Sequence, residues 1–346
     1  MRWIISLILL GLIGNSVPSI VKANDCGAYC AVDFAIEIET NEPNVTPLIP
    51  NTDLMHDRSY YQITGQTQVY DAPNGNPTRI IENGLNYVTA LTEVDGWLQI
   101  NGSEWVQSAS TTNTNYVVSS YTGVLLPSEG LEYPMAWALV NMYPSPAPGA
   151  NPSEQFDFLP RYTRVNIYDT AIVDGHEWYM VAPEQWVHQF NVAKLRPLTE
   201  IPESVDTDIW VSINLYEQVV VAYEGNTPIF ATLTSTGLPR WPTYEGTFNI
   251  YYRNPREFMS WGVVGDDFYS LEEVPWTMFF DEGRALHGAY WHDGFGYRRS
   301  HGCVNLSITD ARWMYDWVSA YMGTNRSADV EVGPAVYVYT TGEYTE

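Results

Sequence analysis

The chain has 346 residues, more than one hydrophobic core usually serves, so two or three domains are expected. Its formal net charge of −25 disfavours nucleic acid and anionic membrane surfaces as partners, because both bind basic faces. Its three cysteines are too few to form a disulfide scaffold.

The N-terminus has the pattern of an export signal. Met1-Arg2 precedes an apolar run over residues 3–13, and Val21-Lys22-Ala23 has small residues at the positions that precede a cleavage point. The run is shorter than the roughly twenty residues that span a bilayer, so we expect a cleaved signal peptide over residues 1–23, no stable membrane insertion and a location outside the cytoplasm. Cys26 and Cys30 are close enough to pair there, which would leave Cys303 alone.

Residues 24–56 are rich in Asn, Pro, Thr and acidic residues, which favours a flexible linker. Two related segments follow, residues 57–115 and 130–200. Each carries two tryptophans eight positions apart, after a strand-like run and a Pro/Gly-rich loop: Trp97 and Trp105, then Trp178 and Trp186. Short alternating strands with such turns favour small β-barrels. The segments resemble bacterial SH3-like domains, which often bind cell wall; rigid spacers or lids are an alternative of nearly equal weight.

The last domain is expected over residues 207–342. Three strand-like runs joined by short turns, at residues 210–215, 218–223 and 229–234, predict a β-meander. Further strands are predicted at residues 246–252, 277–280, 284–287 and 336–339. One helix is predicted to begin with the capping-box-like Ser307-Ile308-Thr309-Asp310 and to end at Gly323, with apolar residues at helical spacing between them.

The motif before that helix carries the chemistry. It reads Ser300-His301-Gly302-Cys303-Val304-Asn305, and His287-Gly288 precedes it. A cysteine attacks as its thiolate, which a neighbouring imidazole can generate. On an extended strand His301 and Cys303 would point into one pocket, and Gly302 would let a substrate carbonyl approach the backbone amides.

This motif resembles the signature of the YkuD-type L,D-transpeptidases, which is a His, a spacer, then Ser/Thr-His-Gly-Cys, an apolar residue and Asn or Arg. Ser235-Thr236-Gly237 and residues 243–248 resemble two further family segments, so the likeness covers about residues 207–340. Tyr244 replaces the usual proline, and only twelve residues separate His287 from Ser300, fewer than is typical. The resemblance implies a mainly β chain: a YkuD-like β-sandwich with one prominent helix, preceded by two small SH3-like β-barrels.

The resemblance also implies a reaction. Cys303 would attack the carbonyl before the terminal D-Ala of a peptidoglycan tetrapeptide stem, forming a thioacyl enzyme as D-alanine leaves. An amine of another stem would then give a 3-3 cross-link, whereas water would give L,D-carboxypeptidase activity. No cofactor is implied. The expected partners are peptidoglycan stem peptides, with wall or glycan binding by the SH3-like segments, in the periplasm or cell wall.

For this reaction we assign Cys303 as nucleophile, His301 as the first candidate base and His287 as the second. Ser300 is expected to orient an imidazole through its backbone carbonyl, and Gly302 with Cys303 to supply amide donors to the oxyanion. The expected substrate contacts are Asn305, Arg298, Arg299, Tyr290 and Trp291. Asn305 alternatively orders the loop, the two arginines alternatively form a solvated charged loop, and His292 with its aromatic neighbours alternatively belongs to a lid.

Three other functions are considered. The paired tryptophans suggest a wall-binding protein with L,D-carboxypeptidase activity or none. A zinc site built from His287, His292, His301 and Cys303 has suitable residue types but lacks a typical spacing. A papain-like peptidase is disfavoured because such enzymes place the cysteine before the histidine, whereas both histidines precede Cys303.

Overall fold

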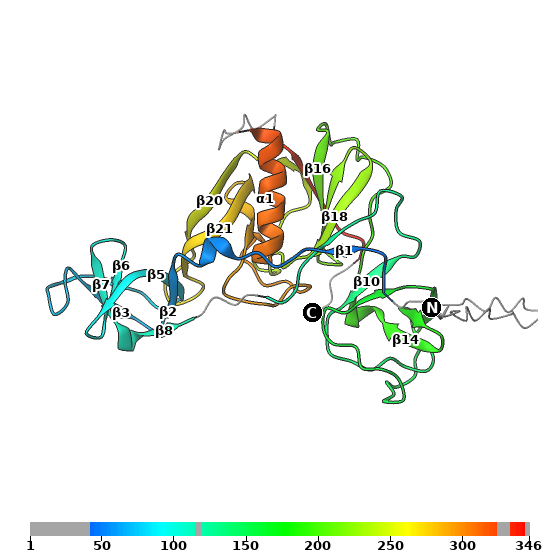
Figure 1. Ribbon diagram of the computed structural model, residues 1–346, viewed down its shortest axis with the longest axis horizontal. Helices are drawn as coiled ribbons and strands as arrows, with labels where there is room; N and C mark the ends of the chain where they lie inside the picture. The colour runs from blue at the N-terminus through cyan, green and yellow to red at the C-terminus, as the bar shows by residue number, and fades with distance from the viewer. Residues whose placement is uncertain (1–41, 115–118, 324–332, 343–346) are drawn as a thin grey trace, which may run out of the picture. The chain divides into compact units, whose positions relative to one another are not determined.

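The structure is a computed structural model that describes residues 42–114, 119–323 and 333–342 (Figure 1). The expected signal peptide over residues 1–23 lies outside these ranges, and so do Cys26 and Cys30. Over the described residues the chain is mainly β, as expected, with one α-helix and three short 3-10 helices. Among them no helix is long and apolar enough to cross a membrane.

The predicted meander is confirmed as the centre of a seven-stranded sheet with the order β1-β9-β18-β17-β16-β24-β19. β16, β17 and β18 pair antiparallel in succession, and β24 lies parallel to β16. Gly225, at φ +57°, makes the turn between β17 and β18 without a Cβ penalty. The strands are β1 (Thr46–Pro47), β9 (Val124–Leu125), β16 (Ile209–Asn214), β17 (Val219–Glu224), β18 (Thr227–Leu233), β19 (Gly246–Asn249) and β24 (Ala335–Tyr339).

A larger sheet of eleven strands holds the remaining catalytic elements. These are β20 (Tyr252–Trp261), β21 (Tyr269–Asp281), β22 (Arg284–Gly288) and β23 (Val304–Leu306). β21 is 13 residues long, although only its last part was expected as a strand. Its first three residues pair in parallel with β5 (Leu85–Val94), a partner almost two hundred positions away in sequence. A local pattern carries no signal of such a distant partner, so the sequence indicated only the hydrophobic end of β21.

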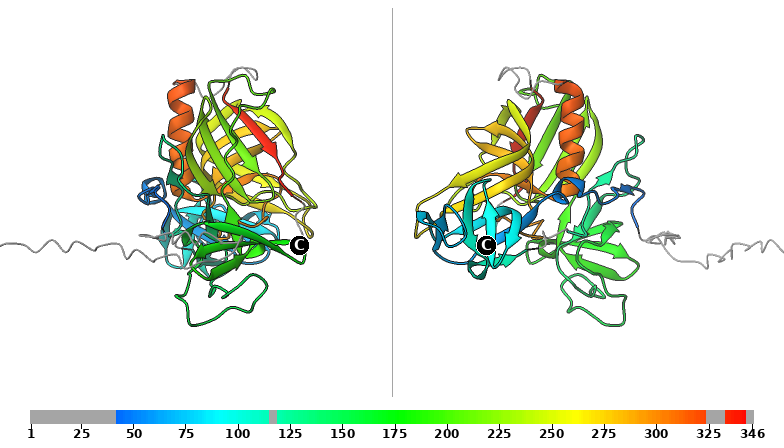
Figure 2. Two further views of the ribbon diagram at one scale, coloured as in Figure 1. Left: turned by 90° about the vertical axis from the view of Figure 1, so that its right-hand side faces the viewer. Right: turned by 60° about the vertical axis from the view of Figure 1, so that its left-hand side comes forward.

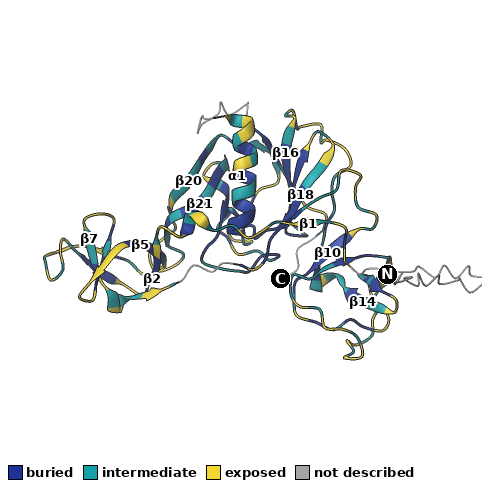
Figure 3. Ribbon diagram, in the orientation of Figure 1, coloured by how far each residue is buried: buried dark blue, intermediate teal, exposed yellow. Residues whose placement is uncertain are grey.

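The predicted helix is confirmed as α1 (Ile308–Met322). Ser307 Oγ accepts the Asp310 N–H at 3.2 Å, and Gly323 ends the helix at φ +66°. The apolar residues of α1 share one hydrophobic cluster with side chains of β16, β21, β22 and β24, so the helix joins the two sheets through a common core. Both further views show α1 against these strands, and Figure 3 shows its buried positions (Figures 2 and 3).

The first tryptophan segment extends the larger sheet through β5. Its strands are β2 (Ser59–Ile63), β3 (Thr67–Tyr70), β4 (Pro77–Ile81), β6 (Trp97–Ile100), β7 (Glu104–Gln107) and β8 (Thr111–Asn113), and its 3-10 helix is η2 (Ser108–Ser110). The segment has its own core, in which Val69, Leu98, Ile100 and Val106 are fully buried. The larger sheet therefore belongs to both the first segment and the catalytic domain.

The second tryptophan segment forms two three-stranded sheets. One contains β10 (Met135–Ala138), β11 (Arg164–Asn166) and β15 (Val192–Lys194); the other contains β12 (Asp169–Val173), β13 (His176–Ala182) and β14 (Gln185–His188), followed by η3 (Gln189–Asn191). The tryptophan pairs lie on matching antiparallel hairpins, β6-β7 and β13-β14. Within the described residues, the strand ladders of neither segment close into a barrel.

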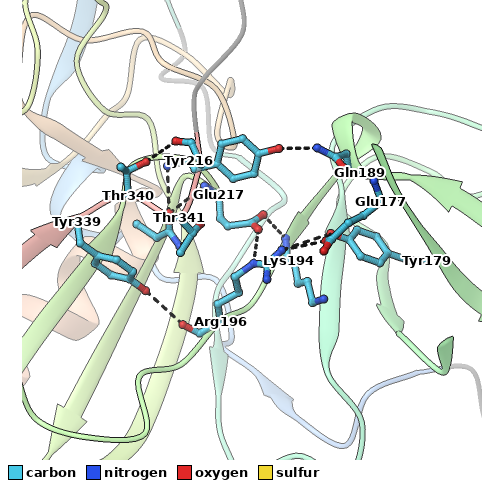
Figure 4. A network of polar contacts seen from close by, with 12 residues as sticks. Glu177, Tyr179, Gln189, Lys194, Arg196, Tyr216, Glu217, Tyr339, Thr340 and Thr341 are labelled. Carbon is cyan, nitrogen blue, oxygen red and sulfur yellow. Dashed lines mark hydrogen bonds and ion pairs between the residues drawn. The ribbon is translucent and has the colours of Figure 1, made fainter. Parts of the chain in front are cut away.

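A polar network ties the second segment to the seven-stranded sheet (Figure 4). Arg196 Nε donates to Glu217 Oε1 at 2.6 Å, and the Lys194 N–H donates to Glu217 Oε2 at 2.7 Å. Glu217 is buried, and burial raises its pKa although both cations oppose the shift. Gln189 Nε2 adds a 2.8 Å hydrogen bond to the Tyr216 hydroxyl. The Glu217 carboxylate receives these hydrogen bonds from the second segment, so the contact favours a fixed attachment of that segment to the seven-stranded sheet.

The described part of the expected linker, residues 42–56, contacts the catalytic domain, although most of its side chains are exposed or half-buried. β1 pairs with β9 at the edge of the seven-stranded sheet. The Asn51 N–H donates to Thr309 Oγ1 at 2.9 Å, and Met55, in η1 (Asp53–Met55), is fully buried. This stretch gains apolar burial and backbone partners from the catalytic domain, which its Pro- and Asn-rich composition did not indicate.

Candidate active site

The catalytic motif departs from the strand geometry expected of it. Residues 301–303 form a bend after Ser300, and β23 begins only at Val304. Gly302 adopts φ +115°, a conformation that residues with a Cβ rarely take. The expectation of an extended strand through His301 and Cys303 is therefore wrong. The two side chains still line one cleft of about 480 Å³.

The segment 235–237 holds this loop by backbone pairing. Ser235 exchanges both backbone hydrogen bonds with Asn305, at 3.0 and 2.9 Å. The Thr236 carbonyl accepts the N–H groups of Arg299 and Ser300 at 2.9 and 3.0 Å. The upstream Ser-Thr-Gly sequence thus acts as a template on which the residues before and after the bend are fixed.

Thr243 fixes the bend itself. Its Oγ1 accepts the Gly237 N–H at 3.0 Å and donates to the Gly302 carbonyl at 2.8 Å. Tyr244, which replaces the family's usual proline, is half exposed, and the Arg284 guanidinium lies 4.1 Å from its ring centroid. A cation–π contact thus occupies the position where the family usually has proline.

Cys303 is half-buried and belongs to the lining of the cleft. Its Sγ lies 4.0 Å from the Gly283 carbonyl oxygen. Burial raises the pKa of the thiol to about 11, while the Ala285 N–H and the Arg284 charge oppose that shift. The cysteine therefore rests as a neutral thiol and needs a base before it can attack.

His287 is placed to be that base. In the parallel pair β22-β23, His287 is in register with Asn305, two positions after Cys303, and His287 and Cys303 face a common pocket. Both line a small pocket of about 70 Å³. His287 Nδ1 lies 3.1 Å from the Gly288 carbonyl, which can only accept, so Nδ1 carries the proton and Nε2 keeps a free lone pair. Burial lowers the pKa of His287 to about 4, which keeps the ring neutral.

His301 lies in an aromatic cage. Its ring centroid is 4.1 Å from that of Trp241, 5.1 Å from that of Tyr269 and 5.8 Å from that of Trp261. Its Nε2 is buried without a hydrogen-bond partner among the described residues. Burial lowers the pKa of His301, with Arg240 lowering it further and Asp267 raising it. His301 is thus a neutral wall of the cleft.

Ser300 and Gly302 brace the loop. The Ser300 carbonyl accepts the Leu238 N–H at 2.9 Å, so it is not directed at an imidazole as expected. Its Oγ donates to the Cys303 carbonyl at 2.5 Å and accepts the Gly302 N–H at 3.0 Å. The sharp bend brings these groups together, which explains the difference from the extended geometry. In this state the Gly302 amide is not free for an oxyanion.

Asn305, which is buried and lines the small pocket, contacts the half-buried His292. The Asn305 side-chain amide lies 2.8 Å from His292 Nε2, and His292 Nδ1 accepts the Gly294 N–H at 3.1 Å. Burial, followed by the nearby Arg299 charge, lowers the pKa of His292 to about 3. Of the two roles considered for Asn305, these contacts favour ordering of the loop.

The remaining expected substrate residues are dispersed. Arg299 and Trp291 line the small pocket, and the Trp291 ring centroid lies 5.6 Å from that of His287. Arg298 is half-buried. Tyr290 faces away from the cleft: it is buried against Tyr60, with centroids 4.5 Å apart, and its hydroxyl donates to the Glu272 carbonyl. The sequence-based assignment of Tyr290 failed because its partner comes from the first segment.

The comparisons with known proteins agree with this geometry. Residues 208–338 match the YkuD family, described as the L,D-transpeptidase catalytic domain. Residues 208–338 are a YkuD domain. The match contains the whole set that the structure assembles around Cys303: the segment 235–237, Thr243, His287 and the loop 300–305.

Similar proteins are matched over part of the chain. Over 132 residues it is 27% identical to "Putative L,D-transpeptidase YciB" of Bacillus subtilis (strain 168), covering 34% of this chain and 64% of that protein, which is less than two thirds of its length. The structure of the catalytic domain from E. faecium L,D-transpeptidase is 21% identical over 38% of this chain and 97% of that chain, with a TM-score of 0.32. Mycobacterium tuberculosis L,D-transpeptidase 1 is 20% identical over 38% of this chain and 61% of that chain, with a TM-score of 0.30.

The YkuD cleft has a lining that sequence reasoning did not find. Trp241, Trp261 and Tyr269 form its aromatic wall, and Arg240 and Arg284 supply its positive charge. Arg284 Nε donates to the Pro242 carbonyl at 3.2 Å, and its NH1 pairs with Asp281 at 2.9 Å. Arg284 lies three positions before His287, and Arg240 and Trp241 lie between the recognised segments 235–237 and 243–248. Trp261 ends β20 and Tyr269 begins β21; neither is near a recognised motif, and both reach the cleft only in the folded chain.

The zinc alternative is not supported. Among the described residues, no three His, Cys, Asp or Glu side chains gather as a possible metal site. The bend at Gly302 places His301 among aromatic rings, while His292 is engaged with Asn305.

Proposed function

We propose that this protein is an exported L,D-transpeptidase that acts on peptidoglycan stem peptides through Cys303. One observation supports the proposal above the others. In the YkuD domain, the Cys303 thiol and a neutral His287 imidazole with a free Nε2 line one small pocket. That arrangement suits acyl transfer in which the base takes the thiol proton as the sulfur attacks.

In the first half-reaction, the Cys303 sulfur attacks the carbonyl that joins the third stem residue to the terminal D-Ala. His287 Nε2 takes the thiol proton and returns it to the nitrogen of D-Ala as the C–N bond breaks. D-Alanine leaves, and the acyl group remains on sulfur as a thioester. The energy of the amide bond is conserved in this thioester, so no nucleotide is needed.

In the second half-reaction, the amine of another stem attacks the thioester carbonyl. The imidazole accepts a proton from the attacking nitrogen and returns it to sulfur as the C–S bond breaks, giving a new amide and a 3-3 cross-link. When water attacks in place of the amine, the product is a tripeptide stem, and the reaction is that of an L,D-carboxypeptidase.

We assign the base to His287 ahead of His301, which the sequence alone favoured. The Gly288 carbonyl sets the tautomer of His287, and the same contact holds the ring in place. The His301 ring is held by three aromatic neighbours. The oxyanion is assigned to the backbone amides of Cys303 and Gly302, with Ser300 Oγ giving up its hold on the Gly302 N–H during attack.

Residues 1–23 are proposed to act as a cleaved signal peptide, and the two tryptophan segments as SH3-like modules that orient the enzyme at the wall. The matching hairpins β6-β7 and β13-β14 support a common origin of the segments. Mature chain carrying Cys303→Ala is expected to sediment with insoluble peptidoglycan, and Trp178→Ala to reduce the bound fraction. A chain that stays in the supernatant would leave the segments as spacers.

The decisive experiment is mass spectrometry of mature protein incubated with disaccharide-tetrapeptide stems, beside the Cys303→Ala variant. We expect release of D-alanine, a thioacyl adduct on the Cys303 peptide and a cross-linked dimer, all absent from the variant. Tripeptide without dimer would show a carboxypeptidase. Folded protein that releases no D-alanine, yet sediments with peptidoglycan, would favour the wall-binding alternative.

A further inference from the structure

A second cavity of about 470 Å³ adjoins the Cys303 cleft. Trp241, Tyr269 and His301 belong to the linings of both, so these three side chains lie where the two cavities meet. The second cavity includes residues 83–85, which come from the first tryptophan segment. The YkuD domain alone therefore does not complete this side of its own active site.

Residues 83–85 are fixed in place by backbone contacts. The Leu85 N–H donates to the Phe268 carbonyl at 3.1 Å, and Leu85 is in parallel register with Tyr269. A Cβ on Gly84 would lie only 2.3 Å from the Phe268 carbonyl oxygen, so this close approach requires glycine. Farther along β5, the buried Glu272 carboxylate accepts the Thr89 N–H at 2.7 Å. Residues 83–85, which form one wall of the second cavity, thus have a defined position relative to Cys303.

The two cavities differ in charge. The Cys303 cleft includes Arg240 and Arg284 in its lining, with Glu282 as its acidic residue. The lining of the second cavity includes Asp266 and Asp267 and, among the described residues, neither lysine nor arginine.

The two aspartates differ in how they are compensated. Asp266 is paired with Arg240 at 2.6 Å. Asp267 has no ion-pair partner among the residues that the structure describes; its Oδ1 accepts the Val263 N–H at 2.6 Å. The second cavity therefore retains an anchored negative charge.

We propose that the second cavity is the acceptor subsite, which admits a chain bearing a primary ammonium, while the arginine-lined cleft takes the carboxylate end of the donor. The inference rests on the proposed transpeptidase function. Asp267 attracts the ammonium, and the unsatisfied Nε2 of His301 offers a polar contact at the junction of the cavities. The ammonium releases one proton to water in the open cavity, and the amine loses its second to His287 as the new amide forms.

The test introduces an arginine into the wall that residues 83–85 form in the second cavity. Leu85→Arg introduces it at a side chain that lines the second cavity and also the small pocket of Cys303, whereas Leu91→Arg introduces it on the same strand, at an exposed side chain that lines none of these cavities. Both are made in the Cys303→Ala mature chain. The probes are a stem tripeptide ending in L-lysine, with a free side-chain amine, and the same peptide acetylated on that amine. Their dissociation constants are measured by isothermal titration calorimetry.

We expect Leu85→Arg to weaken binding of the free amine roughly tenfold, because like charges then meet at close range, and Leu91→Arg to change it less than twofold. The acetylated peptide should bind less tightly than the amine and should not distinguish the variants. Equal affinity of the amine for both variants, or of both peptides for the parent, would overturn the subsite. If Leu85→Arg does not fold, Asp267→Asn gives the same comparison, because its amide oxygen can still accept the Val263 N–H.

Failure of the subsite can be separated from failure of the proposed reaction. Thioacyl formation is followed in chain with Cys303 intact, using donor tetrapeptide alone. An adduct together with unselective amine binding would support the transpeptidase reaction and refute the acceptor subsite. Selective amine binding without any adduct would support a cation-binding site and refute the transpeptidase reaction.

Discussion

Alkylation of Cys303 by iodoacetamide is expected to accelerate with pH far beyond the range in which an ordinary thiol titrates. Burial raises the pKa of this thiol to about 11. Only the thiolate reacts, and at pH 7 it would be roughly one part in ten thousand, against a few per cent for a free cysteine of pKa ~8.5. Cys303 should therefore react roughly 300-fold more slowly than a small thiol at pH 7.

The rate constant should rise about tenfold for each pH unit from pH 7 to pH 10, because the thiolate fraction rises by that factor below the pKa. The assay follows the tryptic peptide that contains Cys303 by mass spectrometry, so that Cys26 and Cys30 do not interfere. Glutathione alkylated in parallel is the control, and its rate should level off near its own thiol pKa.

A rate that is level from pH 6 to pH 9 would refute this reasoning. It would mean that Cys303 rests as a thiolate paired with a His287 imidazolium, although burial lowers the pKa of His287 to about 4. In the neutral pair, the base acts only during attack. His287→Gln should then leave the slope of alkylation unchanged while lowering the rate of D-alanine release by roughly 10²- to 10⁴-fold.

Three further predictions concern the frame of the site. Burial raises the pKa of Asp310 to about 6 from an ordinary value of 3.8. The folded chain then binds this proton more tightly than the unfolded chain, so the contribution of Asp310 to the free energy of unfolding is largest below about pH 4 and falls by about 3 kcal/mol as pH rises through 6. Asp310→Asn should abolish that fall, which is measured by urea unfolding between pH 4 and 7. Ser307→Ala should lower the free energy of unfolding by about 1 kcal/mol, because the Asp310 N–H loses its cap. Gly302→Ala should abolish thioacyl formation in folded protein, because φ is +115° and the new Cβ would lie 2.9 Å from Arg284 Nε; Gly96→Ala, at φ +80° in open space, is the matched control and should remain active.

Local signals predicted much of the catalytic domain. The meander of β16, β17 and β18 was visible because apolar runs and turn residues succeed one another along the chain, and such neighbours usually pair. α1 was visible from the cap at Ser307, its apolar spacing and its stop at Gly323. The residues around Cys303 were recognisable because acyl transfer by a thiol needs a histidine and a glycine at close quarters.

Chain order could not rank the two histidines, because that ranking depends on tertiary geometry. Proximity in sequence favoured His301, two positions from Cys303, but the bend at Gly302 places its ring among aromatic side chains. The parallel pairing of β22 with β23 sets His287, sixteen positions away, opposite Asn305, and His287 and Cys303 line one small pocket. Parallel strands are joined by long connections, so no local pattern reports their register.

The sequence by itself determined which chemical groups are present: a thiol, two imidazoles, a glycine beside the thiol and an excess of acidic residues. The tertiary structure decided how these groups are used, because burial sets the pKa of Cys303 and of His287, and backbone contacts set the tautomer. It also brought residues 83–85 to the site through the pairing of β5 with β21. Desolvation and long-range strand pairing arise only when distant segments meet, which is why neither could be predicted from neighbouring residues.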